Sequence, residues 1–529
     1  MSKCKIAVFS GPNSTIANSP PLVTSNKARL PGEKKLEGEC DPLVPQLLYE
    51  KVTIKIKKHS AHPLEVDASH VYVDDGKDYY EATLNPEDGL YLLPYMARRA
   101  DGTRNGTSFE ANDLENPKIM FGRRQFFYPD ASRMFSEIDR TIYGRDKNGQ
   151  ANVLSSKAEY TFIRALPAGG YASKGEKAGI DYFPYKPYGI AKSVRVGDLA
   201  RVTNIVNSTL KSGLYDGAIW LEGSPSVEET LYWLSLTIDA DLPIVGNAAQ
   251  RTHGQLSADG DRNISDSVDY IISGVGKGLG AVGIQEQQIF AAREFRKTDD
   301  RPGNYVAAGG HGGILGTVKE GKATIWFKPN YKNTLTSDVN LTKLPERIDL
   351  EADAGKTTTY PIKNSDGSLR GEAIPRVHII KYTAFSQEDE TEDPDQEVDI
   401  MARIDRALHE ENSEDTRKPK LHGLILEGNA PFAHGSVSQM KAMSIAALSG
   451  LPVVRTSRSN PGGRVVTIED DLFIEASNLD STKARLLLMA CMLKLGRLPR
   501  ASDPRKPTSA EREAIIEKIK QFQEIFETH

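Results

Sequence analysis

Two short apolar segments each lead into a loop that carries a hydroxyl side chain. Thr15 lies in the loop after Lys5–Phe9, and Ser224 lies in the loop after Gly217–Leu221. If both segments are strands of one parallel sheet, the two loops meet at its carboxyl edge, where such sheets bind ligands. A hydroxyl activated there by a base is a nucleophile for acyl transfer. The residues alone leave open the alternative that both are ordinary turn residues.

Several ordered segments resemble the asparaginase/glutaminase family. Its opening motif, a strand followed by Thr-Gly-Gly-Thr-Ile-Ala, resembles Phe9–Ala17. Its second motif, Asp-Gly, a few apolar residues and His-Gly-Thr-Asp-Thr-Met-Glu-Glu-Thr, resembles Asp216–Thr230. The other matching segments are Leu242–Gly246, Ser257–Gly260 with Asn263, Arg293–Thr298, Gly450–Arg458 and Lys483–Leu488.

The resemblance implies a catalytic group made of Thr15, Ser224 and Lys297. Thr15 would be the nucleophile that forms an acyl-enzyme, which water then releases. Ser224, where the family has threonine, would work with Lys297, because a neutral amine can accept a proton. The backbone around Gly223 is a candidate donor to the oxyanion. Without the resemblance, Lys297 would be interpreted as a surface lysine beside Arg296.

Departures from the family motifs point to an altered substrate. Pro225 stands where the family has an aspartate that partners the lysine and helps to hold the substrate's α-amino group, and Lys27 lies near the place of a family tyrosine. An ammonium group buried without a carboxylate is costly. We therefore expect a neutral or anionic amide, lactam, cyclic imide or hydantoin-like ring in place of L-asparagine. Glu222 is the nearest acidic replacement and could restore a partner for Lys297.

Two more residues complete the candidate substrate site, together with Glu222, Gly223 and Pro225. Ser193 falls near the family's serine that binds the substrate carboxylate. His434 follows a strand of the second unit, where the family places residues that reach a neighbouring subunit's site; the alternative is a solvent-exposed loop histidine. The ten histidines and three cysteines show no metal-ligand spacing, so we expect neither a metal nor a cofactor.

The elements that must position these residues alternate between strands and helices, which predicts a parallel sheet covered on both faces. Ser226 followed by Glu229 has the spacing of a capping box, which predicts a helix start there. Apolar runs and helical spacing predict strands at 5–9, 217–221, 242–245 and 281–284, and helices at 227–237 and about 264–275.

A second α/β unit is predicted in the last third of the chain. We expect a two-domain asparaginase-like α/β fold, with a catalytic domain at 1–345, a linker at 346–373 and a smaller domain at 374–529. Its strands are predicted near 377–380, 424–426, 452–454 and 473–474, and its helices at 437–448, 482–495 and 508–527.

Three stretches differ in composition from these units. Residues 31–185, rich in Tyr, Asp, Gly and Pro, are predicted to be an insertion with β-structure. The linker is expected to form a hairpin around Asn364–Gly367. Residues 386–420 are dominated by Glu and Asp and are predicted to be a solvated insertion with one exposed helix.

Composition limits the classes of partner and compartment. The 529 residues carry 67 basic and 72 acidic side chains, a net charge of -5, so nothing indicates a nucleic-acid or membrane partner. Isolated thiols and the lack of an evident leader predict a cytoplasmic protein. The resemblance implies a homodimer or homotetramer acting on a small amide. Two alternatives remain open: a true asparaginase or glutaminase, and a catalytically silent homologue that binds a small molecule or a protein.

Overall fold

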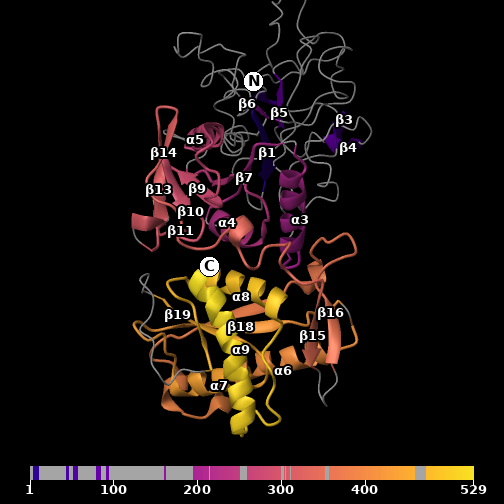
Figure 1. Ribbon diagram of the computed structural model, residues 1–529, viewed down its shortest axis with the longest axis vertical. Helices are drawn as coiled ribbons and strands as arrows, with labels where there is room; N and C mark the ends of the chain where they lie inside the picture. Colours follow the sequence, from indigo (N-terminus) through magenta and orange to yellow (C-terminus); the bar gives the residue numbers. More distant parts are fainter. Residues whose placement is uncertain are drawn as a thin grey trace, which may run out of the picture.

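The computed structural model describes most of the chain from residue 195 onward and several strands before it. Thr15, Ser193 and Pro225 lie outside the described residues. The described ranges are 195–213, 215–224, 226–250, 259–299, 303, 305–309, 311–351, 357–415, 417–458 and 472–529, with strand residues 4–10, 43–46, 52–57, 79–84, 91–94 and 160–162. They form two α/β units, drawn in purple to pink and in orange to yellow (Figure 1).

The first unit is built on an eight-stranded sheet with the order β14-β13-β10-β9-β8-β7-β1-β6. From β6 to β9 the neighbouring strands are parallel. The sheet therefore brings the carboxyl ends of β1 and β7 to one edge. The bounds are β1 (Cys4–Ser10), β6 (Tyr160–Phe162), β7 (Gly217–Leu221), β8 (Ile244–Asn247), β9 (Ala281–Gln285), β10 (Gln288–Ala291), β13 (Ile314–Lys319) and β14 (Lys322–Ile325).

The predicted parallel sheet is extended at one edge by β10, β13 and β14, which are antiparallel to their neighbours. The physical reason is the turn after β9. Glu286 and Gln287 have φ of 49° and 65°, which is the left-handed conformation that two-residue hairpins require. The chain reverses there, and β10 must run back along β9.

Helices cover both faces of this sheet. A Cβ on Gly246 of β8 would meet the side chain of Leu231 in α4 (Ser226–Thr237). The next residue, Asn247, donates to the backbone oxygen of Asn263 in α5 (Gly260–Ser273). Because successive strand residues face opposite ways, α4 and α5 lie on opposite faces. Helix α3 (Asp198–Lys211) precedes β7.

The second unit holds a four-stranded parallel sheet in the order β17-β18-β19-β20. The capping residue predicted for its last helix is confirmed, since Thr508 accepts from the backbone N–H of Glu511. The bounds are β17 (Arg376–Lys381), β18 (His422–Gly428), β19 (Val453–Ser457), β20 (Ile474–Glu475), α6 (Val398–Asn412), α7 (Val437–Leu448), α8 (Ser481–Leu495) and α9 (Ser509–Thr528).

The helix predicted to be exposed in the acidic stretch is half buried. Helix α6 turns Ile400, Ile404 and Ala407 into the core of the second unit. Three or four residues make one helical turn, so these apolar residues form a stripe. Asp399 and Asp405 are exposed, whereas Glu410 is buried with the stripe. The stretch is therefore an acidic-faced, packed part of the domain.

Small antiparallel pairs complete the described structure. The hairpin expected around Asn364–Gly367 is confirmed by the bridge between Lys363 and Leu369. Strand β6, from the predicted insertion at 31–185, joins the main sheet beside β1. The paired strands are β2 (Leu43–Gln46) with β5 (Tyr91–Pro94), β3 (Val52–Lys57) with β4 (Tyr79–Leu84), β11 (Phe295–Lys297) with β12 (Tyr305–Ala307), and β15 (Arg347–Glu351) with β16 (Thr357–Pro361).

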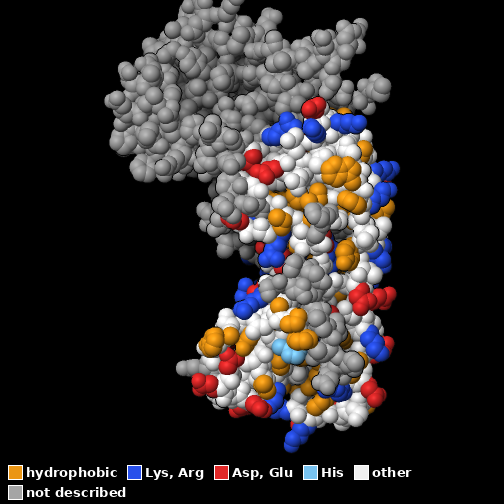
Figure 2. Space-filling model, turned by 90° about the vertical axis from the view of Figure 1, so that its left-hand side faces the viewer, with side chains coloured by type: hydrophobic (Ala, Val, Ile, Leu, Met, Phe, Trp, Pro, Cys, Tyr) orange, Lys and Arg blue, Asp and Glu red, His pale blue; other side chains and the backbone are white. Residues whose placement is uncertain are grey.

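The two units are packed together through α4 and α8. Tyr232, Trp233 and Leu236 of α4 belong to the same apolar core as the second unit. The face in Figure 2 carries both signs of charge interspersed with small hydrophobic groups. No helix in the described part of the chain is long and apolar enough to cross a membrane. The domain boundaries at 345 and 373 stay predictions.

Candidate functional site

Ser224 lies just beyond the carboxyl end of β7, at the edge where the sequence places the chemistry. The strand is buried along its whole length, and its ladder continues one residue further, with the Glu222 N–H donating to the Asn247 oxygen at 3.0 Å. Helix α4 then begins at Ser226, and the Val227 N–H donates to the Gly223 oxygen at 3.1 Å. The half-buried Ser224 is thus held in a short turn between a buried strand and a helix.

The Ser224 hydroxyl contacts a residue that the sequence did not single out. The Tyr305 hydroxyl donates to Ser224 Oγ at 2.8 Å. Tyr305 opens β12, where it lies directly opposite Lys297 of β11. Residues directly opposite in an antiparallel pair project from the same face. Tyr305 and Lys297 therefore project from the same face of the β11–β12 hairpin, and Tyr305 contacts Ser224 from that face.

Helix α4 holds the β11 strand in place through Glu228. The Lys297 backbone N–H donates to Glu228 Oε2 at 2.6 Å. Burial raises the pKa of Glu228 to about 7, while the nearby charge of Lys483 opposes this shift. A carboxyl group with this pKa changes its charge near neutral pH. Glu228 is therefore a titratable group in contact with the backbone of Lys297, the predicted catalytic lysine.

An aromatic stack fixes the ring of Tyr305. It lies 4.3 Å from the ring of Phe295, centroid to centroid, and the two planes are inclined by 11°. Phe295 is fully buried, and its ring occupies the space that a Cβ on Gly283 of β9 would fill. The small residue in the central sheet thus allows the hairpin to pack closely enough for Tyr305 to reach Ser224.

Asp259 ties together three loops at the same edge of the sheet. Its carboxylate accepts from the Gln250 N–H at 2.9 Å, from Gln285 Nε2 at 2.7 Å and from Asn263 Nδ2 at 3.2 Å. These groups follow β8, end β9 and lie on α5. The Ser-Ala-Asp-Gly segment noted in the sequence therefore stabilises the framework of the site through its aspartate.

The comparisons with known proteins agree with the motif matches. Residues 191–330 match the family model described as Asparaginase, N-terminal. Glutaminase-asparaginase from Acinetobacter glutaminasificans is 26% identical over 318 residues, which are 58% of this chain and 78% of that protein. L-asparaginase 2 from Bacillus subtilis (strain 168) is 25% identical over 314 residues, 58% of this chain and 67% of that protein. These matches support an asparaginase-like family for this chain.

The family assignment and the two α/β units together confirm the fold class expected from the sequence. A solved structure, that of the probable cytoplasmic L-asparaginase from Campylobacter jejuni, covers 64% of this chain and 85% of its own, at 22% identity and a TM-score of 0.47. The segment matching the asparaginase model contains Ser224 and Lys297 and begins after Thr15.

The other substrate-site candidates lie apart from Ser224 or outside the described residues. Thr15, Ser193 and Pro225 are among the residues that the structure does not describe. His434 is exposed in the second unit of this asparaginase-like chain, with its ring 6.0 Å from that of Phe432. Its role at a neighbouring subunit's site stays a prediction.

Glu222 does not suit the role of an anionic partner for Lys297. Its carboxyl group is buried and accepts from Trp220 Nε1 at 2.7 Å. A hydrogen bond from Thr230 also reaches it, but burial dominates and raises its pKa to about 8. The group is therefore largely uncharged at neutral pH. The prediction that Glu222 could replace the missing aspartate as a charge is not supported by these contacts.

Burial of Glu222 predicts a pH-dependent stability. The unfolded chain releases this proton near the ordinary pKa of 4.5 and the folded chain near 8, so stability falls as the pH rises between these values and is constant above them. Glu222→Gln keeps an acceptor for Trp220 and cannot ionise. At pH 9 it should be more stable than the parent by up to about 5 kcal/mol, with little difference at pH 5.

Urea unfolding at pH 5, 7 and 9 checks this expectation. The matched control is Glu517→Gln, because Glu517 is exposed on α9 and loses the same charge without burial. If the free energies of unfolding of the parent and of Glu222→Gln changed with pH in the same way, the raised pKa of the buried Glu222 carboxyl would be contradicted.

Tyr305 and Glu228 are the site residues that sequence reasoning missed. One signal was present for Tyr305. Alternating residues on both sides of Pro302–Gly303 indicate a hairpin, and such a hairpin would have paired Tyr305 with Lys297. No signal in a single sequence shows that Glu228 accepts from the Lys297 backbone, because that contact depends on how α4 packs.

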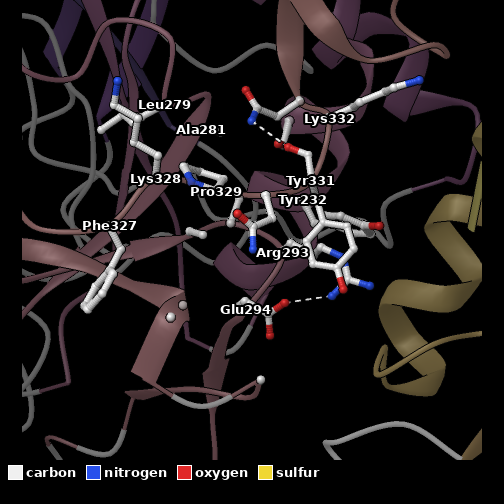
Figure 3. A pocket seen from close by; sticks show the side chains of 18 of the residues that line it. Tyr232, Leu279, Ala281, Arg293, Glu294, Phe327, Lys328, Pro329, Tyr331 and Lys332 are labelled. Carbon is white, nitrogen blue, oxygen red and sulfur yellow. Dashed lines mark hydrogen bonds and ion pairs between the residues drawn. The ribbon is translucent and has the colours of Figure 1, made fainter. Parts of the chain in front are cut away.

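A cavity of about 550 Å³ lies at the opposite edge of the sheet (Figure 3). It is lined by the start of β9 and by Arg293 after β10. The Arg293 guanidinium lies 3.7 Å from the ring of Tyr331, and its nitrogens donate to Glu294 Oε1 at 2.7 Å and to the His529 backbone oxygen at 2.6 Å. Because α9 carries His529 at its end, Arg293 connects the two units here, away from Ser224.

Proposed function

We propose that this protein hydrolyses a carbon–nitrogen amide bond of a small molecule, with Thr15 as nucleophile and with Ser224 and Lys297 managing the proton. The family assignment makes this the natural chemistry. The observation that carries the proposal is the register of the β11–β12 hairpin, which puts Lys297 on the face that contacts Ser224. These two residues are distant in sequence, and a shared hairpin face suits their joint action on one proton.

The proposed reaction has two halves. Thr15 Oγ attacks the carbonyl carbon while its proton passes to the neutral amine of Lys297, and the carbonyl electron pair moves onto oxygen. The carbon–nitrogen bond then breaks, the nitrogen takes up the proton, and an ester to Thr15 remains. Water attacks this ester, giving the carboxylic acid and restoring the threonine hydroxyl.

The proposed substrate lacks a free α-ammonium group. Pro225 has no charged side chain, and the buried Glu222 carboxyl is largely uncharged because its pKa is about 8. An ammonium brought to this loop would lose its hydration without gaining a partner from these two residues. Neutral or anionic open amides, lactams, cyclic imides and hydantoin-like rings avoid that cost.

A substrate panel tests both the chemistry and this preference. Propionamide, succinimide, hydantoin, L-asparagine and L-glutamine would be compared by kcat/KM, with ammonia release measured for open amides and ring opening followed by chromatography. We expect a neutral or cyclic compound to exceed L-asparagine. Pro225→Asp should raise kcat/KM for L-asparagine by roughly 10-fold, since one close ion pair is worth about 1.4 kcal/mol or more.

Two outcomes would contradict the proposal in different ways. Preferred turnover of L-asparagine by the parent would make the chain a true asparaginase. Absence of turnover for the whole panel would favour a silent binding homologue. Pro225→Ala is the matched control, because it changes the backbone at the same position without adding a carboxylate.

We also propose a cytoplasmic homodimer or homotetramer. Closed symmetric assemblies are the commonest state of such enzymes, and the isolated cysteines fit a reducing compartment. Light scattering coupled to size-exclusion chromatography would give the mass of the assembly. A monomeric mass near 58.1 kDa would contradict it.

A further inference from the structure

The Ser224 hydroxyl is hydrogen-bonded to a tyrosine that is distant in sequence, whereas the residue next to it in the loop offers no partner. The next residue in the loop is Pro225, which has no hydrogen-bonding side chain. The contact that the structure provides instead comes from Tyr305, at 2.8 Å between the two oxygens. A serine hydroxyl rotates freely unless a partner fixes it, so this contact decides how Ser224 is oriented.

Tyr305 is itself held on several sides. Only 7% of it is exposed, and its ring is stacked on the fully buried Phe295. Its backbone is paired with Lys297 in the β11–β12 hairpin. A side chain with two rotatable bonds, packed in this way, keeps its hydroxyl at a defined point. The position of Ser224 Oγ therefore depends on a rigid donor and on the hairpin that carries Lys297.

The direction of this hydrogen bond matters for chemistry. Burial raises the pKa of the Tyr305 phenol, and the nearby acids Glu228, Glu222 and Asp259 oppose its ionisation as well. The phenol thus stays protonated and acts as a donor. When Ser224 Oγ accepts from Tyr305, its own proton is directed away from Tyr305. Lys297 shares the face that carries Tyr305, which is the face of the hairpin that reaches Ser224.

We propose that Tyr305 is a positioning residue that orients the Ser224 hydroxyl for proton exchange with Lys297. The inference rests on the proposed amide hydrolysis. To that mechanism it adds Tyr305, as a group that acts through Ser224 and does not touch the substrate.

Tyr305→Phe tests the proposal, because it removes one oxygen and keeps the stacked ring. On the best compound of the amide panel we expect kcat to fall by roughly 10- to 100-fold, which is typical when a reacting group is misplaced, while KM changes by less than about 2-fold. The melting temperature should stay close to that of the parent. Tyr270→Phe is the matched control. Tyr270 is a buried tyrosine of α5 whose hydroxyl has no hydrogen-bond partner among the described residues. The kcat of this variant should be unchanged.

A double-mutant cycle with Ser224→Ala identifies the route of the effect. If Tyr305 acts through Ser224, adding Tyr305→Phe to Ser224→Ala should lower the residual kcat by less than about 2-fold. Full losses in both backgrounds would overturn the inference, and so would an unchanged kcat in Tyr305→Phe when Ser224→Ala is impaired. If Ser224→Ala and Lys297→Met both keep full activity, the proposed function itself fails and this inference with it.

Discussion

Thr15→Ala should lower kcat for the best amide substrate by about 10⁴-fold or more, the scale seen when the nucleophile of a covalent mechanism is removed. Without the hydroxyl, no acyl-enzyme forms, and only substrate binding and oxyanion stabilisation remain. KM should change little, because the nucleophile's hydroxyl acts mainly in the bond-forming step and not in substrate binding. Steady-state release of ammonia or amine measures the loss.

The neighbouring hydroxyl provides the control for this experiment. Ser14 immediately precedes Thr15 in the sequence, and Ser14→Ala should keep kcat within a few-fold of the parent. Acid quenching during turnover, followed by peptide mass spectrometry, should find the acyl group on the peptide that contains Thr15. Turnover that survives Thr15→Ala, or a larger loss in Ser14→Ala, would exclude Thr15 as the nucleophile.

Part of the site could be predicted because strand ends have clear sequence signals. The apolar run Gly217–Leu221 is the strand β7 with the same bounds, so Ser224 was expected at the carboxyl edge of the sheet. Lys297 was assigned by resemblance, and its local position on a hairpin beside Ser224 comes from the structure. Tyr305 was missed because its contact depends on a pairing register, which composition does not reveal.

Differences between the expected and the described contacts and fold have local physical causes. Glu222 was expected as a charged partner for Lys297, yet its carboxyl accepts from the indole of Trp220, a core residue only two positions earlier. The antiparallel edge of the sheet follows from the left-handed turn at Glu286 and Gln287, which neither residue type favours. In α6, the apolar spacing of Ile400 and Ile404 was visible but outweighed by the acidic composition around it.

One buried lysine adds three hydrogen bonds to the connection between the two units. Lys483 of α8 is 2% exposed, and its ammonium donates to the backbone oxygens of Ala292, Arg293 and Phe295 at 3.0, 2.8 and 2.6 Å. These oxygens belong to the segment that leads into β11, two residues before Lys297. The lysine therefore anchors the β11–β12 hairpin to the second unit.

Lys483→Met should lower the free energy of unfolding by about 3–5 kcal/mol, because it leaves three carbonyl oxygens at a buried junction without their donor. Activity should fall as well, since the segment before Lys297 loses its attachment. The matched control is Lys494→Met on the same helix, whose half-buried ammonium donates to a single carbonyl, that of Asp338, at 2.7 Å. It should cost about 1 kcal/mol.

Chemical unfolding of both variants measures the difference, with the substrate assay run in parallel. Equal losses of stability for the two variants would mean that the three carbonyls gain other partners when the lysine is removed. A stability loss in Lys483→Met with unchanged kcat would mean that the hairpin keeps its position through the Glu228 contact with the Lys297 backbone alone. The expected result is a loss of both, because the same three hydrogen bonds join the units and hold the strand that carries the predicted base.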